Sequence, residues 1–197
     1  ESIRVPLFAA WPGHIPEGAV SQELLTPVDI MPSLCGLADV PIPRTVEGLD
    51  LSAAFLGDRP PMSRDAALIM SFHNYTYSPN LIREDGHEWR GVRTRRFTYI
   101  QWREGERMLY DLENDPGQLH NLADTAEYAD EEVRLEQQLR RLLDERGDDL
   151  HPYGYYRDWL DQERRVVRNA FGPLPHPDTP PDWSLLRPAA DVVRTQT

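Results

Sequence analysis

The sequence has 197 residues, enough for one ordinary domain or for one domain with a small subdomain. Hydrophobic residues make up 40% and charged residues 27%, so the chain can build a packed core. The net charge of −12 argues against a nucleic-acid-binding protein, and no apolar run is long enough to cross a membrane. All 21 basic residues are arginine, which excludes a catalytic lysine within the chain. The single cysteine, Cys35, excludes an internal disulfide and a multi-thiolate zinc site.

The first sixty residues have the pattern of the end of an α/β layer. The nearly continuous apolar run 4–11 predicts a strand that is buried on both faces, as in a parallel sheet. Thr26, Pro27 and Asp29 predict the start of a helix. Its apolar positions follow at helical spacing and predict one buried stripe: Ile30, Leu34, Leu37 and Ala38.

The polar, proline-rich stretch 57–65 predicts a subdomain boundary. Beyond it, residues 66–72 predict a strand, and 97–102 with 108–112 predict an antiparallel hairpin or meander. Residues 126–146 predict an amphipathic helix, with Gly147 placed to end it. Its apolar stripe consists of Leu135, Leu139, Leu142 and Leu143. One stripe needs a partner, so we expect this helix to pack on the preceding sheet.

Few residues suggest chemistry without further context. The chain contains no glycine-rich phosphate loop, no G-x-S-x-G and no H-E-x-x-H motif, and its histidines lack metal-ligand spacing. Asp111, Glu113 and Asp115 could resemble a loop that binds a hard cation, but the pattern favours a turn. Cys35 lies within the predicted helix, where a small core residue is the favoured interpretation.

A polar and aromatic segment supplies the candidate substrate-binding residues. We expect His73, Trp89 and Arg90 to line a substrate pocket, since they follow or precede predicted strands. Arginine offers a planar fork of donors that suits sulfate or carboxylate. The alternative for each residue is a surface loop whose polar groups are already satisfied.

Several segments, in this order and spacing, resemble the later part of a type I sulfatase. Those that resemble the end of the sulfatase core are 1–7, 11–16, 28–34 and 47–51. Those that resemble the C-terminal subdomain of the family are 90–94, 96–100, 109–116 and 121–123. The resemblance covers roughly residues 1–146, and no resemblance is assigned to residues 150–197.

The resemblance implies a partial alkaline-phosphatase-like α/β fold with a small C-terminal antiparallel sheet packed by a helix. It also implies hydrolysis of a sulfate ester or sulfamate by formylglycine, made from a cysteine in a C-x-P-S-R or similar motif, with a bound Ca²⁺. Cys35 departs from that motif, because Gly36-Leu37-Ala38-Asp39 follows it. We therefore assign no catalytic residue, metal ligand or cofactor to this chain. We expect the nucleophile and metal site upstream of the matching segment, and the chain to be inactive alone.

These expectations divide the chain into 1–60 (end of the α/β core), 61–150 (C-terminal sheet and helix) and 151–197 (proline-rich extension). The expected partners are a sulfated small molecule or glycan and the missing N-terminal portion of the sulfatase, with a homo-oligomer as a further possibility. Nucleic acid and membrane are not expected partners. Two alternatives stay open: a phosphonate or phosphodiester hydrolase of the same superfamily, and a non-catalytic binding or oligomerisation module.

Overall fold

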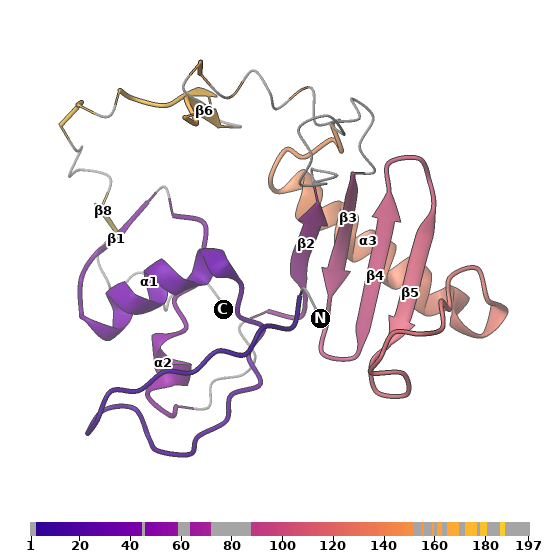
Figure 1. The fold of residues 1–197 in the computed structure, drawn as a ribbon, viewed down its shortest axis with the longest axis horizontal. Helices are drawn as coiled ribbons and strands as arrows, with labels where there is room; N and C mark the ends of the chain where they lie inside the picture. Colours follow the sequence, from indigo (N-terminus) through magenta and orange to yellow (C-terminus); the bar gives the residue numbers. More distant parts are fainter. Residues whose placement is uncertain are drawn as a thin grey trace. The chain divides into compact units, whose positions relative to one another are not determined.

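The computed structural model describes residues 3–44, 46–58, 64–71 and 88–151, together with 155, 159, 161–162, 165–169, 172–176, 178–180 and 186–187. The chain forms two compact units, residues 1–67 with 180–197 and residues 68–179 (Figure 1). The division thus falls within β2, two residues after the proline-rich stretch, and the C-terminal extension is shared between the units. Within the described part of the chain, no helix is long and apolar enough to cross a bilayer.

The first unit contains two helices and one small sheet. Its helices are α1 (Pro27–Leu37) and α2 (Ser52–Phe55). Strand β1 (Ile42–Pro43) pairs antiparallel with β8 (Leu186–Arg187), so the C-terminal extension returns to this unit. Ile42 and Leu51 are buried and belong to its apolar core.

Helix α1 begins where the sequence predicts, but its buried face is polar. Thr26 donates its backbone N–H and its hydroxyl to the Asp29 carboxylate, both at 2.7 Å. Asp29 and Ser33, one turn apart, are buried against the segment around Leu49 and Leu51, whose N–H groups they accept at 2.9 Å. The predicted buried stripe is therefore wrong in this structure. Its Ile30 and Leu34 are exposed, because the polar anchors Asp29 and Ser33 hold a different side of the helix inward.

Residues 4–11 do not form the predicted buried strand. The segment has no regular secondary structure and is exposed along its length. The physical reason is the lack of a neighbour, since none of the strands in the described residues pairs with it. A strand buried on both faces needs ladder partners and two covering layers.

The second unit is built on a four-stranded antiparallel sheet in the order β2-β3-β4-β5 (Figure 1). The strands are β2 (Ala67–Ser71), β3 (Trp89–Arg93), β4 (Phe97–Trp102) and β5 (Arg107–Asp111). In the register, Tyr99 lies opposite both Val92 and Leu109. The predicted strand at 66–72 and the predicted hairpin are thus confirmed.

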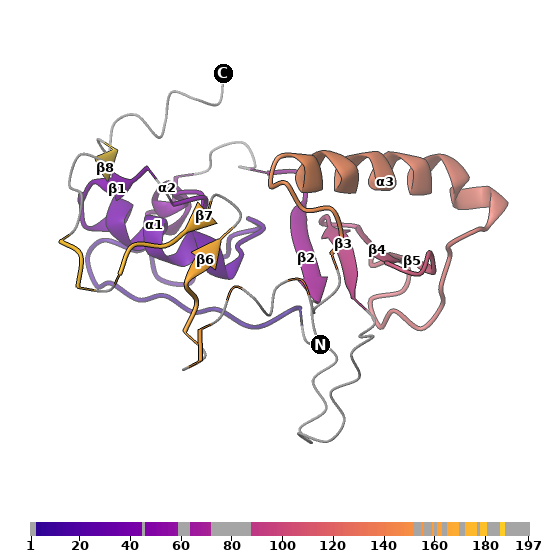
Figure 2. The same ribbon diagram turned by 90° about the horizontal axis from the view of Figure 1, so that it is seen from above.

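Helix α3 (Ala129–Asp144) follows a short 3-10 turn, η1 (Ala126–Tyr128), and lies along one face of the sheet (Figure 2). Leu135, Leu139 and Leu143 are buried, and the helix contacts β3 and β4. Gly147 has φ +61°, the left-handed conformation that commonly ends a helix, as predicted. The unit also contains a small hairpin of β6 (Arg168–Asn169) and β7 (Gly172–Pro173).

Candidate functional site

Strand β3 carries two of the three predicted substrate-binding residues. Trp89 and Arg90 open this strand, whereas His73 lies outside the described residues. Because successive side chains of a strand point to opposite faces, Trp89 and Arg90 lie on different sides of the sheet. Arg90 lies on the α3 side with Val92, and Trp89 lies on the other side. The two side chains therefore cannot line one face of the sheet together, and their role in binding a substrate stays a prediction.

The Arg90 side chain is completely buried and is held by a bidentate ion pair. Its Nε lies 2.6 Å from Asp148 Oδ2, and its Nη2 lies 3.2 Å from Asp148 Oδ1. Its Nη1 also donates to the carbonyl oxygens of Ser71 at 3.4 Å and Trp89 at 3.2 Å. The guanidinium thus ties the end of β2 and the start of β3 to the turn that follows α3. These contacts give Arg90 an architectural role.

Trp89 belongs to a half-buried aromatic and apolar face. It lies opposite Trp102 in the register, and their ring centroids are 6.4 Å apart with the planes tilted by 49°. Ile100, Met108 and Tyr110 share this face and are also half-buried. Partly exposed aromatic rings combine apolar surface with polar edges, a combination suited to an amphipathic ligand.

Asp111, at the end of β5, is the anchor of a turn. Its carboxylate accepts hydrogen bonds from Arg96 Nη2 at 2.7 Å, from Asn114 Nδ2 at 2.9 Å and from the Glu113 N–H at 3.1 Å. The hydrogen bond from Arg96 is the main cause that lowers the pKa of Asp111 to about 2. Asp115 is likewise engaged by the N–H groups of Leu119 and His120. These internal bonds use the carboxylate oxygens, which confirms the favoured prediction of a turn.

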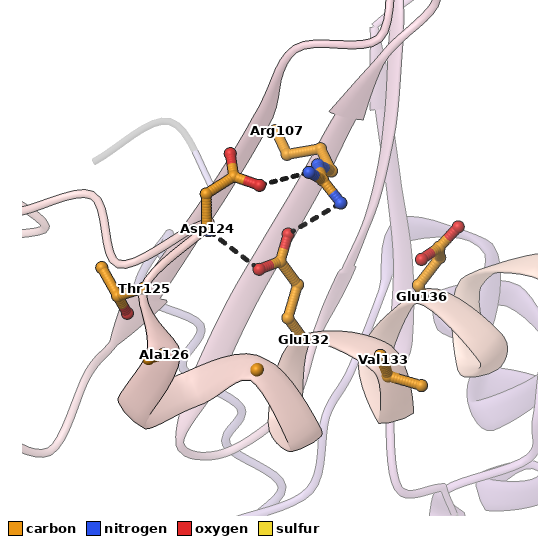
Figure 3. Close-up of a pocket in the computed structure, with 8 residues that line it drawn as sticks. Arg107, Asp124, Thr125, Ala126, Glu132, Val133 and Glu136 are labelled. Carbon is orange, nitrogen blue, oxygen red and sulfur yellow. Dashed lines mark hydrogen bonds and ion pairs between the residues drawn. The ribbon is translucent and has the colours of Figure 1, made fainter.

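A pocket of about 310 Å³ opens between β5 and the start of α3 (Figure 3). Arg107 lies at its centre, paired with Asp124 and, at 3.3 Å, with Glu132 Oε1. The Asp124 N–H donates to the other oxygen of Glu132 at 2.9 Å, and Glu136 also lines the pocket. The lining thus holds three carboxylates and one guanidinium, so the pocket carries an excess of negative charge. It has the wrong sign for a sulfated ligand.

The described residues do not fit a metal or formylglycine centre. Among them, no group of three or more histidine, cysteine or acidic residues could hold a metal ion. Cys35 lies in α1 with its Sγ 3.6 Å from the Met31 Sδ. Its sequence context departs from the C-x-P-S-R type. We therefore derive no reaction step through either group within these residues.

Two polar anchors were not predicted from the sequence. Arg64 Nη2 lies 2.5 Å from Asp29 Oδ1, and the two residues are 35 positions apart. Arg90 and Asp148 are 58 positions apart. The periodicity of apolar residues reflects only contacts within one helix or strand, so it does not predict ion pairs between residues this far apart in the sequence. The one available hint was that buried arginines need a carboxylate, which does not say which one.

Comparison with known proteins identifies relatives over most of the chain. Residues 1–145 match the family described as N-sulphoglucosamine sulphohydrolase, C-terminal. An ulvan-active sulfatase of Formosa agariphila is 34% identical over 158 residues, which is 79% of this chain and 30% of that protein. A Δ4,5-hexuronate-2-O-sulfatase of Bacteroides thetaiotaomicron is 30% identical over 74% of this chain and 28% of that protein.

The fold agrees with this relationship. The solved structure of BT4656 in complex with its substrate D-glucosamine-2-N,6-O-disulfate matches with a TM-score of 0.61 at 24% identity, over 71% of this chain and 28% of that one. The phosphonate monoester hydrolase of Agrobacterium radiobacter matches with a TM-score of 0.50 at 26% identity, over 59% of this chain and 24% of that one. The chain spans less than a third of the length of each of these relatives. Its family match covers about three quarters of its residues, and the chain belongs to the sulfatase family as a form of its C-terminal domain.

Proposed function

We propose that this chain is the C-terminal part of an enzyme that hydrolyses a sulfate ester or sulfamate, and that its substrate is a sulfated carbohydrate. The observation that carries the proposal is the family match over residues 1–145. Relatives with activity on sulfated carbohydrates support the substrate class. They include the hexuronate-2-O-sulfatase and an N-acetylglucosamine-6-O-sulfatase of the same bacterium, which is 29% identical over 149 residues.

The proposal places the nucleophile and the divalent cation in the part of the relatives that this chain does not span. Formylglycine would supply the nucleophile, and Ca²⁺ would neutralise charge that develops on the sulfuryl group. The residues of this chain would bind and orient the carbohydrate. Trp89 offers a half-buried ring at the start of β3, and the buried pair of Arg90 and Asp148 fixes the backbone that carries it. His73 is a further proposed contact.

A phosphonate monoester hydrolase is the second candidate, because one solved structure of that activity matches this chain at 26% identity. The two activities differ in the group that is transferred, and no described residue of this chain discriminates between them. The nucleophile would discriminate, since the proposed sulfatase uses formylglycine from a cysteine.

The experiment compares two proteins: the 197-residue chain and the product of the whole reading frame that encodes it. We expect the longer product, with Ca²⁺, to hydrolyse 4-nitrophenyl sulfate and a sulfated disaccharide, and the shorter chain to hydrolyse neither. Trp89→Ala in the longer product should raise KM for the disaccharide more than KM for the aryl sulfate. Val133→Ala, at an exposed position on α3, is the matched control and should change neither.

Two outcomes would contradict the proposal. Hydrolysis of aryl sulfate by the 197-residue chain alone would refute the assignment of the catalytic groups to another segment. A longer product that cleaves a phenylphosphonate ester far faster than 4-nitrophenyl sulfate would favour the second candidate.

A further inference from the structure

Strand β5 forms an edge of the four-stranded sheet, because it is the last strand in the order β2-β3-β4-β5 (Figure 1). An edge strand presents a row of N–H and C=O groups to which another extended chain can add as a further strand. In this unit the loop after β5, residues 112–123, returns along that edge and forms hydrogen bonds with it. We call this loop the strap.

Asn121 fits the strap to the edge strand. Its Oδ1 accepts a hydrogen bond from the Leu109 N–H at 2.9 Å, and its Nδ2 donates to the Arg107 carbonyl oxygen at 3.1 Å. The adjacent Leu122 N–H donates to the Leu109 carbonyl oxygen at 2.8 Å. The side-chain amide of asparagine has the same kind of donor and acceptor as a peptide group. Asn121 and Leu122 therefore bond to β5 as a neighbouring strand would.

The other end of β5 is also bonded to the strap. The Asp115 N–H donates to the Asp111 carbonyl oxygen at 2.7 Å. The Asp115 carboxylate accepts from the N–H groups of Leu119 and His120 at 2.7 and 2.8 Å, which holds the strap folded. Alternate positions of a strand direct their backbone groups to the same edge. All three carbonyl oxygens on this edge of β5 thus accept hydrogen bonds from the strap.

The edge of β5 is complementary to itself. If β5 of two copies paired antiparallel with Leu109 opposite Leu109, then Arg107 of each copy would lie opposite Asp111 of the other. In the same register Met108 would lie opposite Tyr110. Opposite charges and apolar pairs that face each other across two strands stabilise the pairing. The pattern therefore favours a second copy of this chain as the partner of an uncovered edge.

We propose that the strap protects β5 from strand addition by a second copy of this chain, and that the protection depends on Asn121. Without the Asn121 amide, the Leu109 N–H and the Arg107 carbonyl oxygen lose the groups that cover them. They can then form the antiparallel pair with a second β5, a contact that is the same on both copies and joins two sheets edge to edge. The proposal concerns this unit and does not depend on the proposed enzymatic function.

The experiment measures self-association of the 197-residue chain with and without Asn121→Ala. Sedimentation velocity over a range of concentrations gives the Kd for self-association. We expect Asn121→Ala to lower this Kd at least about tenfold, because the variant uncovers a self-complementary edge. Asn114→Ala is the matched control within the strap. The Asn114 Nδ2 donates to the Asp111 carboxylate at 2.9 Å and not to the backbone of the edge, so the Kd should equal that of the parent chain.

Hydrogen exchange of the Leu109 N–H locates the contact. If β5 pairs with β5, exchange of this N–H in Asn121→Ala slows as the protein concentration rises. If Asn121 only stabilises the fold, the same N–H exchanges faster than in the parent chain at every concentration. Asn121→Ser is a second variant for the case that alanine prevents folding. The serine hydroxyl can still accept from the Ala123 N–H, as the Asn121 Oδ1 does at 3.0 Å, but it is too short to bridge Leu109 and Arg107.

Three results would overturn the proposal. The first is a Kd for Asn121→Ala equal to that of the parent chain, in a variant whose far-UV circular dichroism shows that it is folded. The second is association without concentration-dependent protection of the Leu109 N–H, because the contact would then lie elsewhere. The third is loss of folding in both Asn121 variants, because Asn121 would then be needed for the fold itself. If only Asn121→Ser folds, the first two criteria apply to that variant.

Discussion

The buried pair of Arg90 and Asp148 allows the sharpest stability prediction. Asp148→Ala removes the carboxylate that meets the guanidinium through two hydrogen bonds, while Arg90 stays completely buried. Removing one partner of a buried ion pair costs about 3–5 kcal/mol. The Leu150 N–H, which donates to Asp148 Oδ1 at 2.9 Å, loses its acceptor too and adds ~1 kcal/mol. We expect the free energy of unfolding to fall by about 4–6 kcal/mol.

The double variant Arg90→Met with Asp148→Ala separates the charge from the loss of contacts. Methionine keeps much of the apolar stem of Arg90 and leaves no charge to bury. The carbonyl groups of Ser71 and Trp89 lose a donor at 3.4 and 3.2 Å, a smaller cost of roughly 1 kcal/mol each. We therefore expect the double variant to be at least as stable as Asp148→Ala alone, with a coupling energy of ~2 kcal/mol or more.

The assay is urea denaturation of the 197-residue chain, followed by far-UV circular dichroism. Glu136→Ala is the matched control, because its partner Arg140 is 68% exposed and an exposed i,i+4 pair contributes only about 0.5 kcal/mol. Two results would contradict this reasoning: a loss of less than ~1 kcal/mol for Asp148→Ala, or a double variant whose loss equals the sum of the losses of Asp148→Ala and Arg90→Met. In either case Arg90 is not a buried charge that depends on Asp148.

Three further predictions concern the second unit. The pKa of Asp111 is lowered to about 2 by Arg96, so its ionisation stabilises the fold above pH ~4 and this contribution is lost as the pH falls towards 2. Because Arg96 is half-exposed, we expect about 1–2 kcal/mol, and acid titration of Asp111→Asn should lack this step. Burial, with the nearby Glu136 and Glu132, raises the pKa of Tyr99 to about 12. Stability should therefore decline between pH ~10 and about 12. Absorbance at about 295 nm should show one late-titrating tyrosine. Among the described residues, none accepts from or donates to the buried Tyr99 hydroxyl, so Tyr99→Phe should change the free energy of unfolding by less than ~0.5 kcal/mol and should remove that late titration. In urea denaturation, Leu139→Ala should lower the free energy of unfolding by about 2–5 kcal/mol and Val133→Ala by less than ~0.5 kcal/mol. Leu139 is completely buried, whereas Val133 is 53% exposed. Equal losses of free energy in the two variants would contradict the orientation of α3.

The second unit could be predicted from the sequence because its signals are local. Strands rich in β-branched and aromatic residues and a helix with one apolar stripe are recognised from neighbouring residues alone, and a short charged turn predicts the pairing of β4 with β5. Leu135 and Leu139 are buried as their spacing predicts. The pairing of Arg90 with Asp148 could not be predicted in this way, because an ion pair leaves no periodic trace in the sequence.

The first unit shows the limit of the same reasoning. Periodicity identified the apolar side of α1 correctly, yet the prediction that this side is buried requires something to cover it. In this chain the buried side is set by Asp29, whose carboxylate is shared among Thr26, the Leu49 N–H and Arg64. A polar cluster of this kind can fix the orientation of a helix against its hydrophobic pattern, because rolling the helix would break the Leu49 hydrogen bond and the Arg64 ion pair of Asp29 together.

The outward apolar face of α1 differs from that of an ordinary surface helix, whose polar face meets water. If Ile30 and Leu34 had evolved to face water, substitution by polar residues would carry no cost, and a helix with no outward charge would be an unfavourable choice for solubility. The apolar surface instead agrees with the double-sided apolar pattern of residues 4–11, which by itself predicts burial between two layers. Both segments of this unit thus expose apolar side chains where their sequence patterns predict burial.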